Sequence, residues 1–413
     1  MPHKKTAQVR AGLLVGRLYF RLRVVSKHLG IFRFLRQVVS NAGYSPLTRE
    51  ARMPPAVLFL LRRLLLVPVT LLIITAALYA IVMLVPPERR AYLYLPPKVN
   101  PMDVLADDPL LQSLIEQHHL RDPYPVQYLG WLGRLVQGDW GWSLAARREV
   151  LPYILARTPV TVELLLYASL LFMPVGLLTG TLAAARRGSR FDHGVQLITS
   201  IGTSIPAFVM ALLMMAVFYI GLRWFPLDRI SDSSKIVMDT IDFQAHTGLL
   251  TIDGLLNGRP DITLDALRHL AMPAFTLAIA QWATVSRISR TFVNEELGKD
   301  YITVAHGKGL KQRMVIWRHA VRNALVPILT TSALSVASLV TTLYLVEVLF
   351  NFHGVSDVFL VATSQAAQFG TFDPAPALGF AVYTVFIVLM IMLVLDILQV
   401  LVDPRLRERF NRS

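Results

Sequence analysis

The stretch from Leu64 to Val85 reads LLLVPVTLLIITAALYAIVMLV and decides the fold. It contains no Asp, Glu, Lys or Arg. As a helix it would be about 33 Å long, which is enough to cross the hydrocarbon core of a bilayer. Because lipid offers no hydrogen-bond partner to the backbone, such a segment must be helical. The sequence therefore predicts a membrane protein that is all-α in its spanning part.

Other apolar stretches along the chain extend this pattern. Leu164–Ala185, Gly194–Leu222, Asn323–Val346 and Pro374–Leu395 also lack charged residues, and Leu270–Ser286 is a shorter example. Four prolines within these stretches (Pro68, Pro174, Pro206 and Pro273) are expected to kink the helices. We expect six spans, at about 57–86, 161–186, 194–222, 268–288, 323–347 and 374–402. The first apolar run begins too late for a cleavable signal peptide, so we interpret it as an uncleaved span.

The composition narrows the class of protein further. Of the 413 residues, 54% are apolar and only 16% are charged, which excludes a disordered chain. There is no cysteine, so disulfides, thiolate zinc sites and iron–sulfur clusters are excluded. His193 and His353 have no metal-ligand spacing, and we expect no metal site.

The placement of charge predicts the orientation. If the N-terminus lies inside and six spans alternate, the inside segments hold 28 Lys and Arg against 7 acids. The outside segments hold 13 Lys and Arg against 17 acids. The positive-inside rule therefore places both termini in the cytoplasm. The net charge of +14 is then mostly a cytoplasmic-face charge, and no nucleic-acid partner is expected.

Two terminal segments lie outside the predicted spans. Residues 1–56 form a basic extension, and two interpretations of it stay open: an interfacial helix on anionic membrane lipid, or a partly disordered tail. Residues 57–407 form the predicted six-span domain, and 408–413 a cytoplasmic tail.

The loop between the fourth and fifth spans, 287–322, carries the most information. Asp300–His306 can form a short helix, Gly307 and Gly309 can end it with a sharp turn, and a second helix can start at Lys311. Such an element could dock into a groove on a partner protein. The alternative is an ordinary solvated loop that follows the positive-inside rule.

A set of residues in this loop and at the start of the fifth span matches a known pattern: Arg287, Arg290, Tyr301, Ala305, Lys308, Gly309, Leu310, His319, Ala320, Arg322, Asn323, Ala324, Leu325 and Pro327. In this pattern the segment resembles the permease subunits of binding-protein-dependent ABC importers of the dipeptide, oligopeptide and nickel branch. The sequence departs from the pattern at Val304, His306 and Gly307.

The resemblance extends over roughly residues 57–407. It includes Leu120–Tyr128, Gly138–Ser143, Arg157–Leu164, Ser204–Phe208, Arg268–Ala274 and Asp403–Arg407. Two departures follow the first and fifth spans. The chain has Pro86-Pro87-Glu88-Arg89 where the family often has Pro-Gly-Asp-Pro, and after Glu347 and Phe350 it keeps Gly354 but lacks the preceding Pro.

The resemblance implies a type I importer permease with a cytoplasmic coupling helix between spans four and five. It implies as partners a second homologous permease, two ABC ATPase subunits and an external solute-binding protein. The chain has no phosphate-binding loop, so ATP and Mg²⁺ are expected in the partner ATPases, and the chain itself is expected to be non-catalytic. The coupling residues that it implies are Asp300, Tyr301, Ala305, His306, Lys308, Gly309 and Leu310.

Candidate residues of a translocation pathway follow from polar groups in the spans. Thr331, Ser335, Ser338 and Thr342 share one face of the fifth span, where they could line a pathway or allow close helix packing. Glu163 and Glu347 border the spans, and carboxylates in such places often serve function.

Three classes of protein remain to be separated. The first is the ABC permease subunit, which would form half of a pathway for di- or oligopeptides or related solutes. The second is an ion-coupled secondary transporter that acts alone, which predicts a repeat symmetry and mid-span charges that the sequence lacks. The third is a membrane scaffold, which leaves the loop 287–322 unexplained. The sequence leaves the substrate open.

Overall fold

The computed structural model describes residues 55–95, 99, 104, 108–240, 243–369 and 373–402. Residues 1–54 and 403–413 lie outside the described residues, so the predictions for the basic extension and the tail are not addressed by the structure. Residues 55–402 belong to one compact unit.

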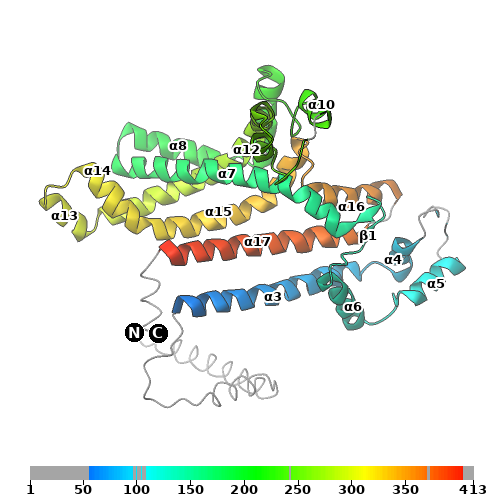
Figure 1. The fold of residues 1–413 in the computed structure, drawn as a ribbon. Coiled ribbons are helices and arrows are strands. Elements are labelled where there is room, and N and C mark those ends of the chain that lie inside the picture. Colours follow the sequence, from blue (N-terminus) through cyan, green and yellow to red (C-terminus); the bar gives the residue numbers. More distant parts are fainter. Residues whose placement is uncertain are drawn as a thin grey trace, which may run out of the picture. The chain divides into compact units, whose positions relative to one another are not determined.

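The described part of the chain is dominated by long helices that run side by side (Figure 1). They are α3 (Pro55–Val82), α7 (Val150–Ala185), α12 (Pro260–Leu297), α15 (Val321–Leu349) and α17 (Pro374–Val402). By length and composition, five helices among the described residues could cross a membrane, or six if one bent pair counts as a span. This agrees with a multi-span membrane protein.

The third predicted span is broken. Its first half is α8 (Arg190–Ser204), and its second half is α9 (Ala207–Met214) followed by the π-helical segment η3 (Met215–Gly221). The halves meet at an angle of 102°. Pro206, which has no backbone N–H and disfavours helix in the residue before it, stands at the break. Helices α3, α7 and α12 instead continue through Pro68, Pro174 and Pro273.

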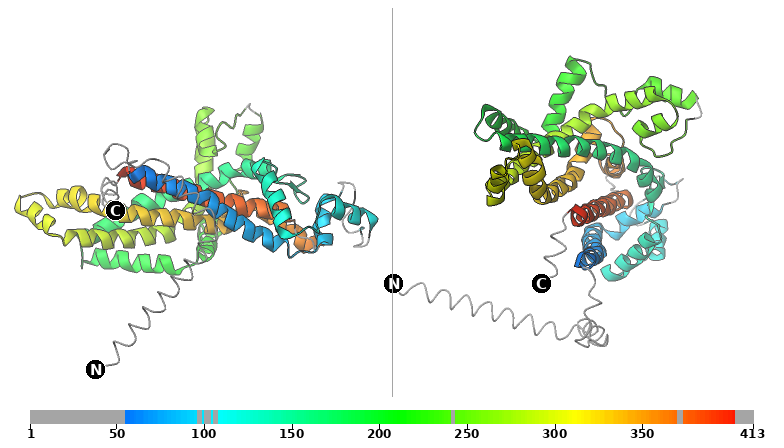
Figure 2. Two further views of the ribbon diagram at one scale, coloured as in Figure 1. Left: turned by 90° about the horizontal axis from the view of Figure 1, so that it is seen from below. Right: turned by 60° about the vertical axis from the view of Figure 1, so that its left-hand side comes forward.

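The fourth and fifth spans are parts of longer helices than the sequence predicts. Helix α12 has 38 residues, and the fifth span continues from α14 (Gln312–Met314) through the π-helical η4 (Val315–Ala320) into α15. Between them lies the short helix α13 (Asp300–Gly307), at one end of the long helices (Figure 1). The start of α3 and the end of α17 lie toward this same end (Figure 2).

Shorter elements gather toward the other end. They are α4 (Pro87–Ala91), η1 (Tyr92–Tyr94), α5 (Pro109–Gln117), α6 (Tyr124–Val136), β1 (Trp142–Ser143), β2 (Arg148–Glu149), α10 (Asp232–Thr240), α11 (Leu250–Leu256) and α16 (Ser356–Phe369). Strands β1 and β2 pair antiparallel, with Ser143 opposite Arg148. The Ser143 hydroxyl donates to Asp373 Oδ2 at 2.9 Å, which ties the hairpin to the start of α17. Burial raises the pKa of the Asp373 carboxyl.

The main core lies between α7, α12 and α15. It contains fully buried Leu164 and Phe172 of α7, Leu277 of α12 and Leu339 of α15. Two glycines one turn apart on α7, Gly176 and Gly180, face α12 closely enough that a Cβ atom would collide with it. Small residues four apart let membrane helices approach in this way, which explains why α7 and α12 pack along their length.

Candidate functional site: the α12–α13–α15 junction

Helix α13 is a short connection with a defined beginning and end. Helix α12 ends at Leu297, Gly298 follows it, and Lys299 precedes the first turn of α13. At the other end, the Gly309 amide donates to the His306 carbonyl at 2.8 Å, and Gly309 has φ +74°. A glycine tolerates this left-handed conformation without a Cβ clash. The short helix and the glycine turn predicted from the sequence are both present.

The inward face of α13 packs against the chain itself. Ile302 and Ala305 are 3% and 6% exposed and belong to the same core as Val315 and Ile316 of η4. Ala305 was expected among the residues that couple to a partner, but here it faces this chain's own core. Its small side chain allows α13 to pack closely on η4 in this structure.

A hydrogen-bond network fixes α13 to both long helices. The Tyr301 hydroxyl donates to Glu296 Oε2 of α12 at 2.7 Å, and Asn323 Nδ2 of α15 donates to the Tyr301 oxygen at 3.1 Å. Lys299 Nζ lies 2.5 Å from Glu296 Oε1. Burial raises the pKa of the Tyr301 hydroxyl, so this group keeps the proton that it donates. Tyr301 therefore links three helices.

The outward face of α13 is open. Asp300, His306, Lys308 and Gly309, which the family resemblance implies as coupling residues, are exposed, and Leu310 is half-buried. The structure adds Val304, which the sequence analysis noted only as a departure from the family pattern. Its side chain is 56% exposed on this face. An exposed apolar side chain on a face that also carries polar ones suits a surface that a partner protein covers.

A buried ion pair holds the neighbouring turn against α12. Arg290 Nε and a terminal guanidinium nitrogen donate to the two oxygens of Asp192, at 2.5 and 2.9 Å. The Gly188 amide donates to the same carboxylate at 3.0 Å, and Asp192 is 1% exposed. Asp192 was not among the predicted site residues. The spacing Ser189-x-x-Asp192 is typical of a helix start, and the Asp192 amide donates to the Ser189 hydroxyl.

Replacing Asp192 with asparagine is expected to lower the free energy of unfolding by about 2–3 kcal/mol, because it leaves Arg290 without its charged partner. This is below the cost for a fully buried pair, since the Arg290 side chain is 23% exposed. The thermal midpoint of the purified chain in detergent measures the effect. Asp261→Asn, at an exposed pair with Arg259, is the matched control and should leave the midpoint unchanged. Equal midpoints for both variants would contradict a stabilising role for the Asp192–Arg290 pair.

Glu163 lies in a buried polar cluster instead of facing an open path. Its Oε1 accepts hydrogen bonds from the Thr251 amide and hydroxyl at 2.8 and 2.7 Å. Its Oε2 lies 2.7 Å from a guanidinium nitrogen of Arg229, and the residue is 2% exposed. In this conformation Glu163 joins α7 to α11 and to the segment before α10.

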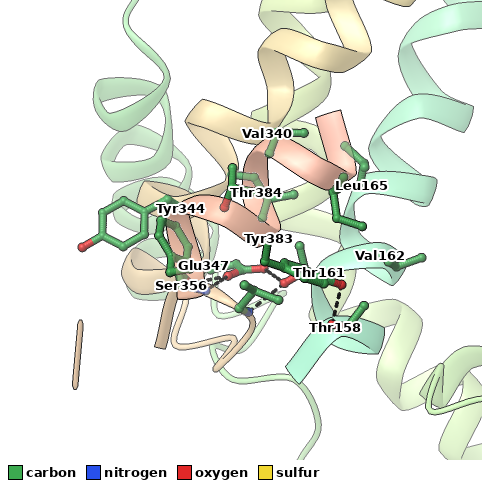
Figure 3. Close-up of a pocket in the computed structure, with 14 residues that line it drawn as sticks. Thr158, Thr161, Val162, Leu165, Val340, Tyr344, Glu347, Ser356, Tyr383 and Thr384 are labelled. Carbon is green, nitrogen blue, oxygen red and sulfur yellow. Dashed lines mark hydrogen bonds between the residues drawn. The ribbon is translucent and has the colours of Figure 1, made fainter. Parts of the chain in front are cut away.

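Glu347 is equally enclosed, at the wall of a cavity of about 50 Å³ (Figure 3). Its Oε1 accepts from the Thr161 hydroxyl at 2.5 Å, and its Oε2 accepts from the Ser356 amide at 3.1 Å and from the Ser356 hydroxyl. Gly354 lies so close that a Cβ there would overlap the carboxylate. The carboxylate therefore fastens α15 to α7 and α16, and offers no free oxygen to a solute in this conformation.

The hydroxyl face of α15 is only partly open. Ser335 is 5% exposed, Thr331 and Thr342 are half-buried, and Ser338 is exposed. The Ser338 hydroxyl accepts a hydrogen bond from Gln281 Nε2 of α12 at 3.0 Å. Gln281 was missed because its neighbour lies 57 residues away in sequence.

A larger cavity, of about 700 Å³, lies between the end of η3 and the start of α12. Its lining includes Arg223, Asp228, Arg268 and His269 beside apolar side chains. Among the described residues, no group of three or more His, Asp or Glu side chains is placed to hold a metal ion.

Residues 176–408 match the family described as the binding-protein-dependent transport system inner membrane component. The chain is 36% identical over 290 residues to the di/tripeptide transport system permease protein DppB of Pseudomonas aeruginosa, covering 70% of this chain and 83% of that protein. It is 32% identical over 312 residues to the oligopeptide transport system permease protein AppB of Bacillus subtilis, covering 74% and 89%. It is 33% identical over 302 residues to the probable D,D-dipeptide transport system permease protein DdpB of Escherichia coli, covering 73% and 85%.

These matches include the described elements from Gly176 to Val402, and with them the junction of α12, α13 and α15. They confirm the family that the motifs of the loop 287–322 indicated. This chain therefore belongs to the family of inner membrane components of binding-protein-dependent transport systems.

Proposed function

We propose that this chain is a permease subunit of an ATP-driven importer of di- or oligopeptides, and that it forms half of the pathway. Its partners are a second homologous permease, two ATPase subunits that bind ATP and Mg²⁺, and an external solute-binding protein. The names of the similar proteins support a peptide substrate. The cavity of about 700 Å³ is consistent with it, because its lining carries both signs of charge beside apolar walls, as a zwitterionic peptide requires.

The observation that carries the coupling part of this proposal is the two-faced helix α13. One face is fixed to α12 and α15 through Tyr301, Glu296 and Asn323, and the other presents Val304 to a partner. A force applied to α13 at Val304 would therefore be transmitted to both α12 and α15. This arrangement suits the transfer of motion from an ATPase subunit, and it supports α13 as the coupling helix.

The proposed orientation places α13, the start of α3 and the end of α17 in the cytoplasm. The charge count supports this orientation, because the segments assigned to the inside hold 28 of the 41 Lys and Arg. Six crossings, with α8 and α9 as one broken span, bring both ends of the six-span domain to one side. A secondary transporter that acts alone has no ATPase partner, so this alternative does not explain the exposed face of α13.

The test is the composition of the complex that contains this chain. The tagged chain is isolated from its native membrane in mild detergent, and the co-purifying proteins are identified by mass spectrometry. We expect a second multi-span permease and at least one ATPase with a phosphate-binding loop. Recovery of the chain alone, under conditions that preserve another importer from the same membrane, would contradict the proposal. Peptide-stimulated ATP hydrolysis with the binding protein then tests the substrate class.

A further inference from the structure

Helix α6 has almost no polar side chain to offer to water. Its 13 residues, YPVQYLGWLGRLV, contain one charge, Arg134, and one amide, Gln127. Gln127 Nε2 donates inward, to the carbonyls of Leu120 and Asp122 at 2.9 and 2.7 Å. Nevertheless, none of its residues is fully buried. A helix that is apolar around most of its circumference needs an apolar environment on its open side.

One side of α6 packs on α3. The Tyr124 hydroxyl donates to the Ala76 carbonyl at 2.6 Å, and the Tyr128 hydroxyl to the Leu72 carbonyl at 3.1 Å. The Tyr128 and Thr75 hydroxyls also share a hydrogen bond at 3.0 Å. The Trp131 ring lies 5.2 Å from the Tyr79 ring. The Tyr124, Tyr128 and Thr75 hydroxyls on this side therefore have hydrogen-bond partners within the chain, which suits a location without water.

The opposite side of α6 is an apolar stripe. Val126, Leu129 and Val136 are 56%, 63% and 81% exposed. With Gly133 they follow the spacing i, i+3, i+7 and i+10, which places them along one face of the helix. We call Val126, Leu129, Gly133 and Val136 the outer stripe of α6. Nothing among the described residues covers it.

The depth of α6 follows from its partners on α3. Leu72 and Tyr79 lie about 12 and 22 Å along the helix from Leu64, where the uncharged stretch begins, so both fall within a hydrocarbon layer of about 30 Å. At this level α3 exposes apolar side chains of its own, Ile73 at 66% and Ile81 at 61%. Helix α6 packs against this part of α3 (Figure 1), so the medium around this part of α3 extends to α6.

We propose that α6 is embedded in the lipid bilayer, with its outer stripe against acyl chains in the leaflet that holds the Val82 end of α3. Thirteen helical residues extend only about 20 Å, so α6 does not form a further span. The predicted extramembrane loop 87–160 thus contains a membrane-bound helix. Lipid is the occupant because α6 packs on the part of α3 that lies within the hydrocarbon layer and exposes apolar side chains of its own.

Single cysteines test this directly, because the chain has none of its own. Val126→Cys and Leu129→Cys are compared with two references. Ile73→Cys on α3 reports lipid, and Asp239→Cys, exposed on α10, reports water. Membranes that contain the full complex are opened so that both faces are accessible, and a water-soluble maleimide is added. The α6 cysteines are expected to react at least about tenfold more slowly than Asp239→Cys, because hydrocarbon suppresses the reactive thiolate.

A photocrosslinker separates lipid from a protein cover. Benzoylphenylalanine at Val126 or Leu129 is expected to attach to lipid, detected as a mass increase of this chain. Maleimide labelling at the rate of Asp239→Cys would overturn the proposal, because the stripe would then face water. Crosslinking of this chain to another protein would also overturn it, because a subunit would then cover the stripe.

Discussion

Replacing Gly180 with alanine is expected to remove most of the assembled protein from the membrane. The added Cβ would lie 2.7 Å from Ser289 Cβ and well inside 3.0 Å of the Ser286 carbonyl oxygen. Both atoms belong to α12, and one of them is backbone that cannot rotate away. Helices α7 and α12 must then move apart, at a cost of about 3 kcal/mol or more, the upper end of the overpacking range.

The effect should extend beyond the contact itself. The Cβ would also lie 3.0 Å from the Arg290 amide, so a shift of α12 would disturb the ion pair of Arg290 with Asp192. The amount of chain in the membrane and its thermal midpoint in detergent measure the loss. Gly194→Ala on α8 is the matched control, because its Cβ would meet nothing within 4 Å. Normal amounts and an unchanged midpoint for Gly180→Ala would show that the close approach of α7 and α12 is not required.

Replacing Val304 with aspartate is expected to abolish solute uptake while the chain remains folded. Val304 is 56% exposed and its side chain contributes little to the core, so the variant should keep its thermal midpoint. A charge on the outward face would be buried without a partner when an ATPase subunit docks. We expect at least about a hundredfold loss of affinity, about 3 kcal/mol, from such a buried unpaired charge.

Two further variants make the Val304 experiment decisive. Val304→Thr keeps the shape without the charge and should retain uptake. Gln312→Asp adds the same charge at an exposed position of α14, outside α13, and should also retain uptake. Uptake, ATP hydrolysis and the recovered ATPase are measured for each. If Val304→Asp transports normally with its ATPase bound, α13 is not the coupling helix.

Local chemistry was enough to predict several elements. Pro206 was expected to disturb a span, and a helix break stands there, because proline acts on its own backbone neighbours. Gly309 was expected to end a short helix, and it does so with a positive φ. In both cases the cause lies within a few residues of the effect, so the sequence carries it directly.

The surroundings of the buried acids could not be predicted in this way. Glu163 is 88 residues from Thr251, and Glu347 is 186 residues from Thr161. Their partners are brought together only by the packing of several helices, and a single sequence gives no measure of such pairings. The same reason explains why the burial of Ala305 could not be predicted, since it depends on how α13 packs on η4.

The unbroken length of α12 has a mechanical consequence. A helix of 38 residues is about 57 Å long, nearly twice the thickness of the hydrocarbon core. It connects the cavity beside His269 directly to the helix that bears Val304. A tilt of 5° about its midpoint would displace each end by about 2.5 Å in opposite directions. A small tilt of α12 at one membrane face would thus move its other end directly, without rearrangement of side chains between the two.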